Sequence, residues 1–188
     1  MTQDNIILIP IGSANFERAA AYAKQAELGG TSQIRSAKDR QRKLQQDQLV
    51  GQLGQMAFCL YLTGNSNMYR LSRYWVNIDP SRGDGGSDFP GANVDVKTSK
   101  VSADRIDDLL NYNLVVRTKE RHARSVYVLA FAIDQGDRWT VALVGWASDK
   151  DLPQESTTDA RFPPNINGEA FLIRADKLNP LMPLEWFY

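Results

Sequence analysis

The sequence has little of what builds several common kinds of functional site. It contains one cysteine, Cys59, and one histidine, His122, in 188 residues. An internal disulfide is therefore impossible, and neither a Cys/His zinc cluster nor a Cys–His catalytic dyad is expected. Cys59 lies in an apolar run, so we interpret it as a core residue of a protein from a reducing compartment, the cytoplasm.

Long apolar runs and an excess of charge of one sign are lacking as well. The apolar stretch at residues 6–11 is short, contains Pro10 and has no basic flank. It fits neither a membrane span nor a signal peptide, so we expect an early strand there and no membrane partner. The formal net charge is zero, so attraction to nucleic-acid phosphates would require local basic patches.

The composition and length are those of an ordinary globular domain. Hydrophobic residues make up 43% and charged residues 23% of the chain, and the length suits a single domain covering residues 1–188. A helix is expected over residues 14–28, with Ser13 as its N-cap and Gly29-Gly30 as its end. A second helix is expected over residues 38–62, ended by Gly64-Asn65.

The second predicted helix has two kinds of face. Apolar residues recur at helical spacing and predict a stripe in the core: Leu49, Leu53, Met56 and Leu60. Glutamines recur on another face, which by default is polar surface: Gln41, Gln45, Gln48, Gln52 and Gln55. Gly51 and Gly54 each cost about 1 kcal/mol relative to alanine in a helix, which predicts close packing against a neighbour.

Strands dominate the remainder of the chain. Residues 125–133 and 139–147 are β-prone and separated by a turn, which predicts an antiparallel hairpin in the centre of a sheet. Other expected elements are strands at 74–78, 94–101 and 170–174, a short helix at 104–110, a loop at 151–168 and a terminal turn at 177–184. Helices followed by a mixed sheet indicate an α/β (α+β) domain.

The segment 83–99, GDGGSDFPGANVDVKTS, carries the chemistry. In a strand Asp95 and Lys97 project on the same side, about 6–7 Å apart along the chain. Pro90-Gly91 is favoured in a type II turn, which would fold Asp88 back beside Asp95. Asp84 fits a turn former better than a ligand, and a plain solvated acidic turn is the alternative for the whole approach.

Two neighbouring carboxylates repel each other, and a hard divalent cation with oxygen ligands removes that repulsion. We therefore expect Asp88 and Asp95 to bind Mg²⁺, for which Mn²⁺ can substitute, with the carbonyl of Val96 as a further ligand. Lys97 beside the metal can position or deprotonate a water, or offset charge that grows on a phosphate.

These motifs together resemble the PD-(D/E)XK, or restriction-endonuclease-like, nuclease superfamily. The matching features are a GQLGQMAF helix, an Asp-rich approach and DVK on a strand, followed by Gly145-Trp146 and a Leu-Pro tail. The resemblance implies a mixed central sheet flanked by helices, and a Mg²⁺-dependent endonuclease that hydrolyses phosphodiester bonds in DNA. It also implies that the acids matching Asp88 and Asp95 bind metal and that the matching Lys97 serves the hydrolytic water.

The departure from this pattern is Gln55, where such proteins commonly carry a glutamate. An amide oxygen can accept a hydrogen bond from water on the metal, or ligate weakly, and it brings no charge. Gln55 therefore either assists catalysis or marks an impaired nuclease that retains DNA or partner binding. Cleavage of a duplex needs two active sites or two successive nicks, so a homodimer is one expectation.

Two basic runs and one lysine beside the motif are candidates for contact with DNA phosphates. For the two runs, a solvated surface is the more common explanation. The candidates are Arg35, Lys38, Arg40, Arg42, Lys43, Lys100, Arg117, Lys119, Arg121 and Arg124. His122 lies in the second run, where a surface or phosphate-contact role is favoured over catalysis. The aromatic residues Tyr74, Trp75, Trp139 and Trp146 are interpreted as core or sheet residues rather than as stacking platforms for bases.

Overall fold

The computed structural model describes residues 2–29, 38–65, 88–89, 93–158 and 169–181. Within these ranges it describes only the backbone of residues between 25 and 44. Several predictions lie outside these residues: the strand at 74–78 with Tyr74 and Trp75, the turn at Pro90-Gly91, Asp84 and Arg35. The basic side chains of Lys38, Arg40, Arg42 and Lys43, and that of Gln41, also lie outside. Among the described helices, none combines the length and apolar character needed to cross a lipid bilayer.

The helices form where capping and periodicity predict them. Helix α1 spans Ser13–Gly29 and helix α2 spans Lys38–Thr63. The prediction that Ser13 is the N-cap of α1 is wrong. Ser13 is the first helical residue, because the first helical hydrogen bond runs from Phe16 N to the Gly12 carbonyl. Gly64 ends α2 as predicted: its φ of 62° is left-handed, and its N–H bonds to Leu60 O at 2.8 Å, a glycine cap.

Within the part of the chain that the structure describes, the main sheet has four strands in the order β1-β5-β4-β2. These are β1 (Ile7–Ile11), β2 (Val94–Ser102), β4 (Val126–Asp134) and β5 (Trp139–Ser148). The β4–β5 hairpin is antiparallel and central, as predicted, and β1 pairs antiparallel with β5. Strand β2 runs parallel to β4, so the sheet is mixed, and β1 and β2 are its two edge strands among the described residues.

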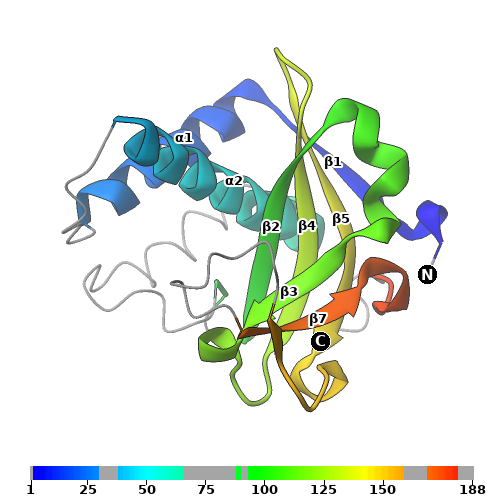
Figure 1. Ribbon diagram of the computed structural model, residues 1–188. Helices are drawn as coiled ribbons and strands as arrows, with labels where there is room; N and C mark the ends of the chain where they lie inside the picture. The colour runs from blue at the N-terminus through cyan, green and yellow to red at the C-terminus, as the bar shows by residue number, and fades with distance from the viewer. Residues whose placement is uncertain (1, 30–37, 66–87, 90–92, 159–168, 182–188) are drawn as a thin grey trace.

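A second sheet crosses the first. It has the order β3-β7-β6, with β3 at Asn113–Arg117, β7 at Glu169–Arg174 and β6 at Thr157–Thr158. The short β6 lies within the predicted loop. Residues 104–110 do form a short helix, of 3-10 type, within η2 (Ala103–Asn111). Figure 1 shows α1 and α2 on one side of the main sheet, with β3 and β7 across the other side.

The main sheet is buried on both faces, and its side chains alternate between two cores along each strand. On β4, Val128, Ala130 and Ala132 face a helix-side core. The intervening residues Tyr127, Leu129, Phe131 and Ile133 face an opposite core built with β3, β7 and η2. The predicted mixed α/β architecture is therefore confirmed, and both Trp139 and Trp146 pack against the helix-side core as expected of sheet residues.

Helix α2 is buried far more widely than its predicted apolar stripe. Leu53, Met56 and Cys59 are buried, as predicted. The interpretation of the glutamine face as polar surface is wrong for Gln52, which is only 5% exposed; Gln55, predicted as a site residue, is 8% exposed. This half of α2 packs against the main sheet, so its polar side chains are enclosed along with its apolar ones.

Close packing at the helix glycines is confirmed at one position. A Cβ added at Gly54 would lie 1.8 Å from Thr98 Oγ1 and 2.8 Å from Thr98 Cβ. Helix α2 therefore crosses β2 at a distance that only glycine permits. A Cβ added at Gly51 would meet nothing within 4 Å, so packing does not explain that glycine.

Candidate active site

The candidate site is built around the outer edge of β2. In the parallel register Asp95 lies beside Tyr127 and Lys97 beside Leu129, and both of those β4 residues face the opposite core. Asp95 and Lys97 therefore project from the same face, as their spacing predicts. Val94 and Val96 point the other way, into the helix-side core.

Asp88 reaches this edge because the chain reverses direction between it and β2. Phe89 forms an antiparallel bridge with Val94, and the Asp88 N–H donates to Val94 O at 2.9 Å. The predicted return of Asp88 toward Asp95 is thus seen in the backbone.

The Asp88 carboxylate binds the backbone of β2 and a side chain of α2. Its Oδ2 accepts a hydrogen bond from Val96 N at 2.7 Å, and its Oδ1 accepts one from Gln55 Nε2. Asp88 as a whole residue is only 6% exposed. Hydrogen bonds to a charged acceptor are stronger than neutral ones, about 1.5–3 kcal/mol each, so these two contacts fix Asp88 firmly.

The same geometry directs a backbone carbonyl to this edge. In an extended strand the N–H and C=O of one residue point to the same side. Since Val96 N bonds to Asp88, the Val96 carbonyl faces the Asp88 side of β2 rather than β4. Asp88 is therefore bonded to the residue next to Asp95 on β2, and the Val96 carbonyl lies on the same side of the strand as Asp88.

Lys97 lies between two carboxylates. Its Nζ is 2.7 Å from Asp95 Oδ2 and 2.9 Å from Glu120 Oε2. Burial by itself lowers the pKa of Lys97, but the charges and hydrogen bonds of Asp95 and Glu120 together outweigh it, and the pKa is raised above its ordinary value. Lys97 is therefore an ammonium ion near neutral pH, suited to donating hydrogen bonds rather than to taking up a proton.

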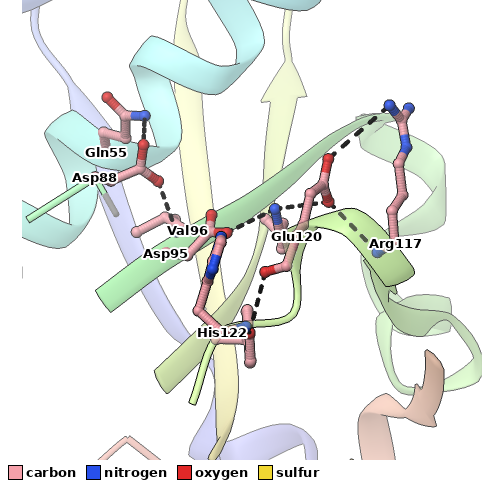
Figure 2. A network of polar contacts seen from close by, with 9 residues as sticks. Gln55, Asp88, Asp95, Val96, Arg117, Glu120 and His122 are labelled. Carbon is pink, nitrogen blue, oxygen red and sulfur yellow. Dashed lines mark hydrogen bonds and ion pairs between the residues drawn. The ribbon is translucent and has the colours of Figure 1, made fainter. Parts of the chain in front are cut away.

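Glu120 is the site residue that the sequence did not predict. It ends η3 (Thr118–Glu120), a short turn after β3. The Tyr127 hydroxyl fixes this turn, because it donates to Glu120 O at 3.1 Å and accepts from His122 N at 2.8 Å. Figure 2 shows the resulting line of contacts, from Gln55 and Asp88 on one side of β2 through Asp95 to Glu120 and Arg117.

The signal that pointed to Glu120 was present but weak. It is an acid inside the basic run 117–124, and its contact with Lys97 spans 23 residues of sequence. Neither periodicity nor a motif relates such distant positions.

The donors present fit a hard cation in type. They are carboxylate, amide and carbonyl oxygens, which Mg²⁺ prefers. Gln55 Oε1 is buried and has no hydrogen-bond partner among the described residues, so one enclosed oxygen is left for a ligand or a water. No three side chains of His, Cys, Asp or Glu come together as a metal-binding group within the described part of the chain, so any such ion would depend on two carboxylates.

Two of the remaining predicted DNA contacts, Lys100 and Arg121, already form ion pairs with aspartates outside this network. Lys100 pairs with Asp134 at 2.8 Å and lies 5.0 Å above the Trp139 ring. Arg121 pairs with Asp149 at 2.8 Å and lies over the Phe171 ring at 4.5 Å. Both side chains therefore have structural partners.

Exposed basic residues of the second run fit phosphate contact better. Lys119, His122 and Arg124 are exposed, and Arg124 has a φ of 66°. Arg117 lies 3.9 Å from Glu120 Oε1 through Nη1, next to Lys97. Their contact with DNA stays a prediction.

Comparisons of the chain with protein-family models, with curated proteins and with solved structures find no match.

Proposed function

We propose that this protein is a Mg²⁺-dependent endonuclease that hydrolyses phosphodiester bonds in DNA, with a restriction-endonuclease-like arrangement of its sheet and active site. The observation that carries the proposal is the position of Asp88 against Val96. That contact brings a buried carboxylate, a second carboxylate at Asp95 and an ammonium at Lys97 to one edge of a parallel strand pair. Spacing along the sequence alone would not require this convergence.

The roles follow from the contacts. Asp88, Asp95 and the Val96 carbonyl would hold Mg²⁺, and Gln55 would orient Asp88 through its amide N–H. Bound Mg²⁺ supplies Lewis acidity and positive charge next to the phosphate. Lys97, kept protonated by its two acidic neighbours, donates a hydrogen bond that positions the attacking water or stabilises charge growing on the phosphate oxygens.

Plasmid cleavage tests this proposal. Wild-type protein with Mg²⁺ is expected to nick or cut plasmid DNA, and Lys97→Ala is expected to reduce the rate by at least about 100-fold, the usual range for loss of one electrostatic donor. Lys150→Ala is the matched control, because Lys150 is an exposed lysine that takes no part in the network around Asp95. Equal cleavage by wild type and Lys97→Ala, or no cleavage by wild type on varied DNA substrates, would refute the proposal.

A second function is favoured by one observation. Both oxygens of Asp88 accept hydrogen bonds from the protein itself, one of them from the Gln55 amide. A nuclease-like domain that binds DNA or a partner protein without efficient cleavage would retain this arrangement. Gln55→Glu separates the two functions: cleavage gained by the variant indicates an impaired native enzyme, and cleavage unchanged or reduced indicates that glutamine belongs in the active site.

A further inference from the structure

A cleft of about 400 Å³ opens between β2 and β3, beside the candidate active site. Its lining includes cationic, anionic, polar and apolar side chains: Lys97, Arg117, Glu120, Ser99, Asn113 and Leu129. Lys97 belongs to both the cleft and the network around Asp95, so whatever enters the cleft comes next to the candidate active site.

The Glu120 carboxylate occupies the cationic side of this cleft. It accepts a hydrogen bond from Lys97 Nζ at 2.9 Å and one from the Arg117 backbone N–H at 3.4 Å. The Arg117 guanidinium lies 3.9 Å from its other oxygen. An ammonium, a guanidinium and a backbone N–H are also the groups by which proteins bind phosphate oxygens.

This cluster is accessible from solvent. The side chains of Lys97, Glu120 and Arg117 are 21%, 29% and 39% exposed. The Arg117–Glu120 pair is long, at 3.9 Å, and its arginine is exposed; such a surface pair contributes only about 0–1 kcal/mol, so Glu120 can turn away from Arg117 at small cost when an anion arrives. The Tyr127 hydroxyl holds the backbone of the turn, which leaves the Glu120 side chain as the part that would move.

We propose that the β2–β3 cleft is a subsite for a backbone phosphate of a nucleic acid, bound by Lys97 and Arg117, and that Glu120 occupies it as an internal anion until the nucleic acid displaces it. The inference rests on the proposed nuclease function and names how that site takes its substrate. Glu120 is thereby a positioning residue: it holds Lys97 in place and competes with the incoming phosphate.

Glu120→Gln tests the competition, since it removes the charge and keeps the shape of the side chain. Binding of a labelled DNA duplex, measured by fluorescence anisotropy in Ca²⁺ without Mg²⁺, is expected to tighten about fivefold. Asp108→Asn is the matched control, because Asp108 also pairs with an arginine three residues away, Arg105, on an exposed surface. The two variants change the net charge equally, so equal binding by both overturns the proposal.

Arg117→Gln tests the cation. It is expected to reduce the slope of log affinity against log salt by about 1, the share of one phosphate contact. Arg105→Gln is its control and should leave the slope unchanged. An unchanged slope for Arg117→Gln overturns the proposal.

A titration of wild-type protein needs no variant and separates the possible anions. Amide NMR signals of Arg117 and Glu120 are expected to shift with the DNA duplex, and to shift with inorganic phosphate only at far higher concentration. Shifts with inorganic phosphate alone overturn a nucleic-acid subsite. Mg²⁺-dependent cleavage without these shifts overturns the cleft while the nuclease stands, and shifts with DNA but no cleavage support the cleft while the nuclease proposal fails.

Discussion

Gln55→Glu offers a physical test of the metal site that does not depend on catalysis. Gln55 Nε2 donates to Asp88 Oδ1, and the two side chains are 8% and 6% exposed. The variant replaces that donor with a second carboxyl group. Without metal, the protein must either accept two adjacent buried charges or protonate one of them.

The expected cost follows from these two options. Loss of a hydrogen bond to a charged acceptor costs about 1.5–3 kcal/mol. Protonation of a glutamate with an ordinary pKa of about 4.3 costs about 4 kcal/mol at pH 7 and restores a donor to Asp88. Protonation thus sets a ceiling, and we expect the free energy of unfolding to fall by about 2–4 kcal/mol.

The sign of the pH dependence is also fixed. Burial gives the introduced carboxyl a folded-state pKa above its unfolded-state value. The loss of unfolding free energy relative to wild type is therefore greatest above that raised pKa. It shrinks as the pH falls toward about 4.3, where the unfolded chain is protonated as well. Urea unfolding from pH 8 to pH 5 measures this narrowing against wild type.

Mg²⁺ should then reverse the loss. A cation between the carboxylates removes their repulsion, and a ligand at 100 times its Kd adds about 2.7 kcal/mol of stability. We expect Mg²⁺ to stabilise Gln55→Glu more than wild type in urea unfolding at pH 7. Gln52→Glu is the control, because Gln52 is equally buried in α2 and has no role in the proposed site. No Mg²⁺ effect, or an equal effect on the two variants, would refute the reasoning.

Two further predictions concern the core. Gly54→Ala should lower the free energy of unfolding by about 1–3 kcal/mol, because the added Cβ would overlap Thr98. Gly51→Ala should leave the free energy of unfolding unchanged or raise it by up to about 1 kcal/mol. Equal urea midpoints for the two variants would contradict the close crossing of α2 and β2. Burial raises the pKa of the Cys59 thiol, and its hydrogen bond with Thr63 has a smaller opposite effect. The stability of the wild type should therefore decline above the unfolded-state pKa of about 8.5, and Cys59→Ala should lack that part of the decline. Parallel stability profiles of the two proteins from pH 7 to pH 10 would show that Cys59 does not titrate differently in the folded state.

Local sequence patterns were sufficient for most of the helices and strands. The end of α2 at Gly64 and the β4–β5 hairpin each depend on neighbouring residues, and both match the structure. The alternation that puts Asp95 and Lys97 on one face is local too. The parallel pairing of β2 with β4 is not local, and no sequence pattern indicated it.

What the sequence could not predict lies in contacts between distant segments. Gln52 looked like surface because polarity was the available signal, yet the tertiary structure encloses it. Glu120 reaches Lys97 only because η3 follows β3 across the opposite face of the sheet. The burial of Gln52 and the acid at Glu120 are therefore features of the assembled fold rather than of any motif.

The most direct test of the central claim is a crystal structure of the protein soaked with Mn²⁺, read by its anomalous difference density. We expect a peak within bonding distance of carboxylate oxygens from both Asp88 and Asp95 and of the Val96 carbonyl, and loss of that peak in Asp88→Asn. Mn²⁺ density elsewhere on the protein, with none between Asp88 and Asp95, would contradict the claim.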